Sequence, residues 1–155
     1  MRKRRSFIND PLLSVIDNSQ KLIEQQILDI TNYNGYFHDG YLRNLTHKGS
    51  QIEFFLESSI INPEDFSEKA LLTNDMKIKG VLTASSIISI IIDDQKTTKP
   101  LKMEYDYAEI LTLKTDKKKV YLLIEWDNYS SSPECELLSE IIVEAENIHW
   151  ESMSG

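Results

Sequence analysis

The stretch Tyr36-Phe37-His38-Asp39-Gly40-Tyr41-Leu42 marks a change of pattern along the chain. Before it, apolar residues between positions 12 and 30 recur at spacings of three and four, which is typical of an amphipathic helix. After it, apolar and polar residues alternate with a period of two, which is typical of half-buried strands. We therefore expect a helical N-terminal arm to give way to a sheet at this stretch.

The expected helix begins at Asp10-Pro11 and ends near Gly35. Asp10 can cap the free backbone amides, and Pro11 at the first helical position loses no N–H that needs a partner. The polar residues 17–19 can divide the segment into a short helix and a longer one. Gly35 suits the left-handed residue that ends a helix. The apolar stripe of this helix needs cover, which only the sheet is large enough to supply.

About seven strands are expected after the helix, joined mainly as hairpins. The expected strands are 36–45, 51–57, 76–84, 87–92, 103–113, 120–126 and 141–150. Residues 59–75 read as an irregular connection with a helical turn around 65–70. Ile148 has the opposite parity from Val143, which predicts a bulge near Asn147.

The run 87–92 is apolar on both faces and rich in β-branched residues, which predicts a central strand covered on both sides. We expect the N-terminal helix to pack over it, because such a run at an exposed edge is prone to aggregation. The patterns together predict an α+β fold, with one or two N-terminal helices on an antiparallel, curved or partly closed meander of about seven strands. Residues 10–151 form this single domain, between a basic flexible segment, 1–9, and a disordered tail, 152–155.

The chain is acidic, with a formal net charge of −8 over 155 residues. Basic residues crowd positions 2–5, and after Lys119 there is no Lys or Arg but eight Asp and Glu. Nucleic acid is not an expected partner, because phosphate neutralisation needs clustered Lys and Arg. An acidic surface favours a basic protein partner or simply serves solubility. No window approaches the roughly 20 apolar residues of a membrane span, so a cytoplasmic protein is expected.

Several kinds of catalytic site are not expected. The single Cys135 excludes internal disulfides and cysteine zinc sites, and its neighbours Glu134 and Glu136 would raise its pKa and blunt its reactivity. The chain contains no Gly-x-Ser-x-Gly elbow and no Gly-rich phosphate loop. No cofactor and no metal are therefore predicted.

A second interpretation is a small enzyme or a ligand- or metal-binding sheet, with a site at His38, Asp39, Glu109 and His149. His38 and Asp39 are adjacent on an expected strand and would point to opposite faces. Glu109 shares the parity of the expected core residues, so it is either a buried carboxyl with a perturbed pKa or is turned to water by a bulge near Ala108. The bulge is the favoured alternative.

Aromatic and acidic residues accumulate in the last third of the chain, where they predict a protein-binding face. The residues of this predicted face are Tyr121, Glu125, Trp126, Asp127, Tyr129, Glu144, Glu146 and Trp150. Taken singly, each tryptophan is expected in the core. A third interpretation is a homodimer or larger homo-oligomer that buries an edge strand or the 87–92 face.

The stretch 36–42, followed by strands that end in Asn147-Ile148-His149-Trp150, resembles small bacterial domains in which a Phe/Trp-His-Asp-small-x-Ile/Leu motif opens the sheet. Several of these resemble immunity proteins of polymorphic toxin systems. The resemblance spans about residues 33–150. It implies a non-catalytic acidic binder that occludes a toxin, and hence an immunity-like protein, inhibitor or adaptor rather than an enzyme.

Overall fold

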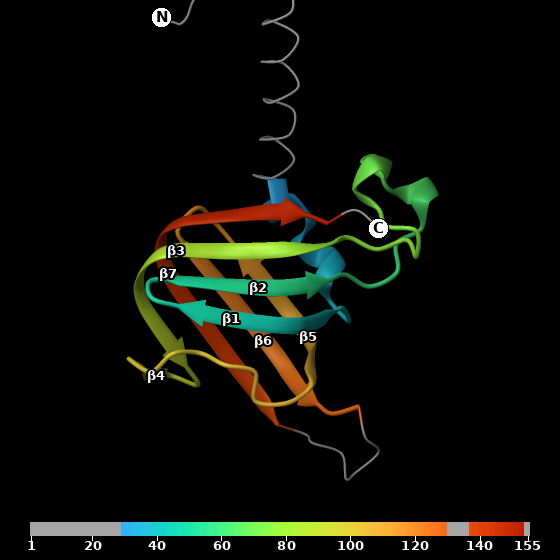
Figure 1. The fold of residues 1–155 in the computed structure, drawn as a ribbon. Coiled ribbons are helices and arrows are strands. Elements are labelled where there is room, and N and C mark those ends of the chain that lie inside the picture. The colour runs from blue at the N-terminus through green and yellow to red at the C-terminus, as the bar shows by residue number, and fades with distance from the viewer. Residues whose placement is uncertain (1–28, 130–136, 154–155) are drawn as a thin grey trace, which may run out of the picture.

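The computed structural model describes residues 29–129 and 137–153, which form a closed antiparallel β-barrel (Figure 1). The barrel strands are β1 (Tyr41–Lys48), β2 (Gln51–Glu57), β3 (Lys79–Ile92), β5 (Tyr107–Thr115), β6 (Lys119–Asp127) and β7 (Leu138–Ser152). Their order around the barrel is β2-β1-β5-β6-β7-β3, and β3 closes the ring by pairing with β2 as well. The short strand β4 (Gln95–Lys96) pairs with the end of β3.

Closure depends on the long strand β3, which pairs with β7 along most of its length and with β2 along its first half. Halfway along β3, Ser86 has a φ of 55°, and the register with β7 shifts between Ile87 and Ser89. The bulge bends the strand, and Figure 1 shows β3 and β7 turning together at the same end of the barrel. This bend lets a single strand serve both sides of the ring.

The α+β prediction is wrong. The sheet closes on itself and buries its own apolar face, so no helix is needed to cover it. Within the described residues the helical segments are the 3₁₀ helices η2 (Asp29–Phe37), η3 (Pro63–Asp65) and η4 (Lys69–Leu71). The rest of the expected N-terminal helix, from residue 10 to 28, lies outside the described residues, as do residues 1–9.

The barrel interior is filled by alternating side chains from all six strands, as expected for a ring of this size. Helix η2 lies across one end, where Phe37 is fully buried and its ring meets that of Trp150 edge-on, with 5.7 Å between centroids. Tyr33, Tyr36 and Phe66 form a second aromatic cluster beside it. None of the helices in the described part of the chain is long and apolar enough to cross a membrane.

Several strand predictions are confirmed. The strand 51–57 has the predicted bounds and buries Ile52, Phe54 and Leu56. The hairpin formed by β5 and β6 is present, with Val120 and Leu122 facing the core. The connection 59–75 is irregular and contains two short 3₁₀ turns, as expected.

Other predictions are corrected. The first strand begins at Tyr41, because residues up to Phe37 belong to η2. The run 87–92 continues β3 and is not covered on both faces, since the Ile88 side chain is 58% exposed. In β7 the buried residues change from odd positions up to Ala145 to the even position of Trp150, as predicted. The bulge was expected near Asn147 of β7, but the register shift lies in β3, between Ile87 and Ser89.

Gly80 should be intolerant of substitution, because a Cβ there would collide with the Glu151 carbonyl oxygen and the Trp150 indole. We expect Gly80→Ala to lower the free energy of unfolding by about 3 kcal/mol, measured by urea denaturation. Gly35→Ala is the matched control, because a Cβ there has no neighbour within 4 Å. Equal stabilities of the two variants would contradict the close packing of β3 on β7.

Candidate functional site

The outer surface of the barrel across β5, β6 and β7 is acidic around Glu109 and Glu125, while two lysines, Lys114 beside Tyr121 and Lys119 opposite Glu144, lie at its other end. Cross-strand register places Glu109 opposite Glu125 and Tyr107 opposite Asp127. On the other side of β5, Glu109 lies opposite Tyr41 of β1. We call the outward carboxylates and tyrosines of this surface the acidic face. Its members are Asp39, Tyr107, Glu109, Tyr121, Glu125, Asp127, Tyr129, Glu140 and Glu144.

Three carboxylates, those of Asp39, Glu109 and Glu125, lie near one another on the β1 side of the acidic face. The pKa of Glu109 lies above its usual value because the carboxyl is partly desolvated and lies near the carboxylates of Asp39 and Glu125. Within the described residues, no Lys or Arg forms an ion pair with any of the three. Like charges directly opposite each other on neighbouring strands destabilise a sheet. Repulsion between these carboxylates therefore remains, with the His38 imidazole as the group that offsets part of it.

His38 sits at the edge of this group. Its Nδ1 lies 2.6 Å from the Leu111 carbonyl oxygen and donates to it, and its Nε2 lies 3.6 Å from Oδ1 of Asp39. Asp39 has a φ of 65° at the turn before β1, and its amide donates to the Ile110 carbonyl. This turn positions His38 and Asp39 beside β5, close to Glu109.

The structure does not bring His149 to the other three residues of the predicted His/carboxylate site. His149 lies on β7 opposite Thr83 of β3, whereas Glu109 lies on β5 between β1 and β6. Among the described residues, no group of three or more His, Cys, Asp or Glu side chains could hold a metal ion. Glu109 faces outward, but the bulge that turns it lies at Leu111 rather than at Ala108. Ala108 itself is buried.

Tyrosines form the apolar part of the acidic face. The Tyr107 ring stacks on Tyr129 with centroids 5.1 Å apart, and Tyr41 meets Tyr107 edge-on at 5.7 Å. The Tyr107 hydroxyl donates to Oδ2 of Asp127 over 3.0 Å, and this bond is the main reason that its pKa is raised. Tyr129 remains 70% exposed. The stacked rings offer rigid contact area beside the carboxylates.

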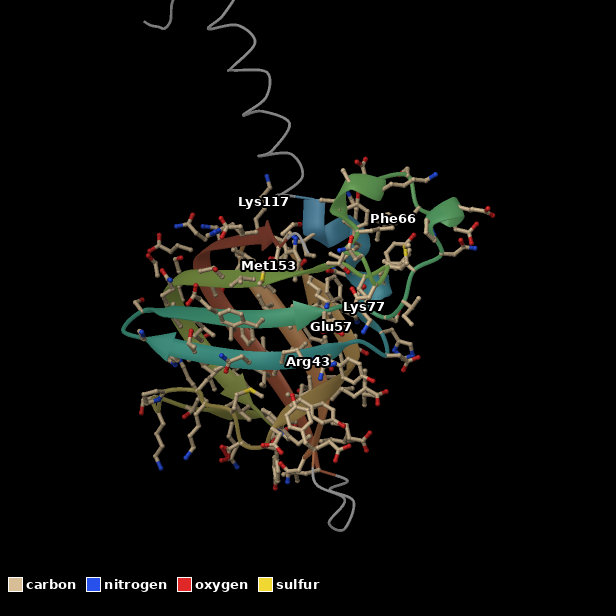
Figure 2. The ribbon with its side chains drawn as sticks, turned by 45° about the vertical axis from the view of Figure 1, so that its right-hand side comes forward. Arg43, Glu57, Phe66, Lys77, Lys117 and Met153 are labelled. Atoms are coloured by element: carbon tan, nitrogen blue, oxygen red, sulfur yellow. The ribbon has the colours of Figure 1, made fainter. Side chains whose placement is uncertain are left out.

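A partly buried ion cluster of Arg43 on β1, Glu57 on β2 and Lys77 just before β3 borders these tyrosines (Figure 2). Glu57 is only 8% exposed, and its carboxylate accepts from Arg43 Nε at 3.1 Å and from Lys77 Nζ at 2.5 Å. Burial acts to raise the pKa of Glu57, but the hydrogen bonds and charges of the two cations outweigh it, so the net pKa is lowered. The Arg43 guanidinium also lies 4.3 Å from the centre of the Tyr41 ring. Both cations are thus committed to internal contacts.

The residues of the predicted binding face divide into two groups. Trp126 and Trp150 are each 2% exposed, and their Nε1 atoms donate to the hydroxyls of Ser139 and Ser152. Both tryptophans are core residues and cannot anchor an interface. The remaining predicted residues are at least partly accessible, namely Tyr121, Glu125, Asp127, Tyr129, Glu144 and Glu146.

Tyr121 is tied to its neighbour on β7. Its hydroxyl donates to Oε2 of Glu140 over 2.8 Å, and this bond raises the pKa of Tyr121. Glu146 lies apart, near the bend that β7 shares with β3.

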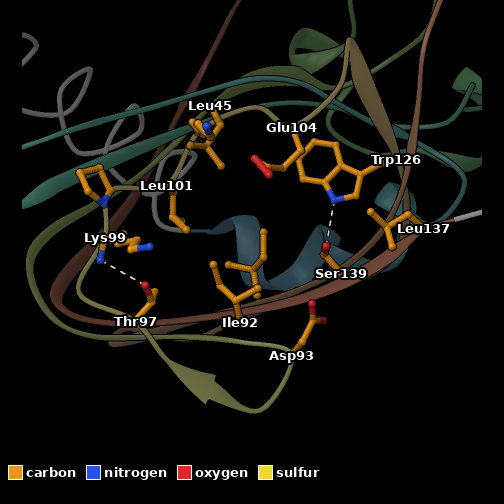
Figure 3. A pocket seen from close by; sticks show the side chains of 13 residues that line it. Leu45, Ile92, Asp93, Thr97, Lys99, Leu101, Glu104, Trp126, Leu137 and Ser139 are labelled. Carbon is orange, nitrogen blue, oxygen red and sulfur yellow. Dashed lines mark hydrogen bonds between the residues drawn. The ribbon is translucent and has the colours of Figure 1, made fainter. Parts of the chain in front are cut away.

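Four members of the acidic face are absent from the predicted binding face, namely Asp39, Tyr107, Glu109 and Glu140. The sequence also did not predict a pocket of about 380 Å³ at the end of the barrel opposite η2 (Figures 1 and 3). Asp39 and Glu140 reach the acidic face only through the pairing order of the strands, which no local pattern reveals. The pocket has one sequence signal, the apolar Leu101 between lysines in a polar loop.

Comparisons of the chain with models of known protein families, with curated proteins and with solved structures give no match.

Removing the Glu109 charge should stabilise the free protein. A carboxyl with a raised pKa weakens the fold when ionised, so its cost is absent below the usual value of 4.5 and appears as the pH rises through the raised pKa. We expect Glu109→Gln to raise the free energy of unfolding at pH 7 by about 0.5 kcal/mol, with no gain near pH 3.5. Urea denaturation at both pH values measures this. Glu151→Gln, on β7 opposite Val81, is the control and should change little.

Removing the Glu57 charge, in contrast to that of Glu109, should destabilise the protein. Its lowered pKa contributes stability that is present above the usual value of 4.5 and is lost as the pH falls through the lowered pKa. Glu57→Gln should therefore cost about 2 kcal/mol at pH 7, because it leaves Arg43 and Lys77 without their carboxylate, and the difference from wild type should narrow in acid. If the difference in unfolding free energy between wild type and Glu57→Gln stayed constant across the acid range, the destabilisation would come from packing rather than from charge.

Proposed function

We propose that this chain is a non-catalytic protein-binding module that receives a basic partner on the acidic face. The observation that carries the proposal is the group of Asp39, Glu109 and Glu125, three carboxylates that form no ion pair with a Lys or Arg among the described residues and have only the imidazole of His38 beside them. Their mutual repulsion weakens the free protein, and a Lys or Arg from a partner would relieve it. A surface whose carboxylates repel one another is suited to binding a cation from a partner.

The tyrosines beside the carboxylates support a protein partner rather than a small cation. Tyr107 and Tyr129 supply rigid stacked rings, and Leu138 on β7, opposite Glu125, is 50% exposed. Aromatic anchors flanked by charges are common in protein interfaces, where the rings supply affinity and the charges speed association. The face therefore fits a partner that presents both apolar and basic side chains.

The resemblance of residues 36–42 to immunity proteins fits this proposal. Asp39, within that motif, lies beside Glu109 on the β1 side of the acidic face. In an immunity-like protein the partner would be a basic toxin domain, bound in the cytoplasm and blocked by occlusion rather than by chemistry.

The proposal is tested by affinity capture from native lysate with three forms of the chain. The face variant carries Glu109→Gln, Glu125→Gln and Asp127→Asn. The control variant carries Glu64→Gln, Asp65→Asn and Glu151→Gln, which remove the same charge from exposed positions elsewhere. We expect the wild type and the control to retain a stoichiometric basic protein that added salt releases, and the face variant to lose it.

Association rates then separate a direct role from a change in folding. With the captured protein as analyte, the face variant should associate about tenfold more slowly at low salt, while the control keeps the wild-type rate. Glu109→Gln alone should stabilise the free chain and yet weaken the complex. Equal retention by all three forms, or no retained protein with any of them, would contradict the proposal.

A further inference from the structure

The pocket at the end of the barrel is separate from the acidic face. The loop 97–104 crosses this opening between β4 and β5 and encloses about 380 Å³ against the ends of β1, β3, β6 and β7 (Figure 3). Pockets that bind small organic molecules typically start at about 300 Å³, and barrel mouths are a common place for them. The volume is therefore sufficient for a ligand rather than for water alone.

The inner wall of the pocket is apolar. Leu45, Ile92, Leu101 and Ile141 line it from four different elements, and the edge of Trp126 completes it. The Trp126 Nε1–H is already bonded to the Ser139 hydroxyl, so the indole presents no unsatisfied donor. A hydrocarbon chain or a ring would be the matching part of a ligand, because apolar burial gives about 25 cal/mol per Å².

The loop that forms the outer wall is held in place by His47 at the end of β1. The Leu101 amide donates to Nδ1 of His47 over 2.8 Å, and the His47 Nε2 lies 3.2 Å from the Gly49 carbonyl. Nδ1 can accept only when it carries no proton, so the ring is the neutral tautomer that donates from Nε2 to Gly49. The amide of Thr97 donates to the Ile90 carbonyl at the other end of the loop. The wall is thus fixed before any ligand arrives.

The rim carries two lysines and two acids, which lie in different parts of the opening. Lys99 and Lys102 line the pocket, and neither forms an ion pair within the described part of the chain. Of the two acids in the lining, Asp93 is held by the Glu140 amide, which donates to its Oδ1 over 2.8 Å, and it lies beside Ser139, away from Lys99 (Figure 3). Glu104 remains free on the wall beside Trp126 (Figure 3). Lys99 therefore lies on the part of the rim that is remote from both acids (Figure 3).

We infer that this pocket binds an amphipathic organic anion, with an apolar body against the inner wall and a carboxylate between Lys99 and Lys102. The apolar wall suits the hydrocarbon part. Lys99 and Lys102 form no ion pair within the described residues, and Lys99 lies away from Asp93 and Glu104, which favours an anionic head group on that side (Figure 3). The inference concerns a surface distinct from the acidic face and does not depend on the protein-binding proposal.

Probes that share one hydrocarbon chain isolate the head group. Octanoate, octanol and octylammonium are titrated into the Trp150→Phe variant, so that fluorescence reports only Trp126 at the pocket wall. Octanoate should bind saturably and about tenfold more tightly than octylammonium, from the modest attraction and repulsion of two partly exposed lysines. Isothermal calorimetry on the wild-type chain should give the same order without the tryptophan substitution.

Single substitutions at the rim should shift the affinity in opposite directions. Lys99→Gln or Lys102→Gln should weaken octanoate about threefold and leave octanol unchanged, whereas Glu104→Gln should tighten octanoate. Lys96→Gln on β4, outside the lining, is the control and should have no effect. The inference is overturned if octylammonium binds as well as octanoate, if neither lysine substitution affects octanoate, or if no probe gives saturable binding.

Discussion

The structure depends on the pairing of β2 with β3, which turns a sheet into a closed barrel. Without it, β2 and β3 would each present an unpaired edge, and the apolar inner face would need a covering layer. The bulge after Ser86 makes this pairing geometrically available, because it bends β3 away from β2 after Ser85 while β3 remains paired with β7. The filled interior, the position of η2 across one end and the pocket at the other all follow from closure.

Closure also determines which surfaces remain for function. A barrel that covers its own core leaves the outer side of every strand available, and across β5, β6 and β7 that side carries the acidic face. The repulsion between Glu109 and Glu125 is a local conflict in an otherwise consistent fold, and such conflicts are expected where function and stability compete. Glu57, which like Glu109 lies opposite Tyr41, differs in that its carboxylate forms ion pairs with two cations, Arg43 and Lys77.

The sequence predicted what depends on local alternation. The strand 51–57, the β5–β6 hairpin and the inward face of β6 follow from side chains that alternate between core and water. It failed where pairing between distant segments decides the outcome. The run 87–92 looked like a buried central strand because periodicity cannot reveal a bend that exposes Ile88. The site was partly predicted. Glu125 and Asp127 face outward as expected, whereas both tryptophans bond their N–H groups inside the core. The sequence placed Asp39 and Glu109 together only in the alternative site, without the β1–β5 pairing that brings them beside Glu125.

Amide hydrogen exchange along β2, followed by NMR, tests closure most directly. In the closed barrel β2 has a paired strand on each side, β1 and β3, so its amides from Gln51 to Glu57 should all exchange slowly. In an open sheet β2 would be an edge strand, and every second amide would point into water. Uniform protection along β2 is the result that this account predicts. Alternating fast and slow exchange would contradict it.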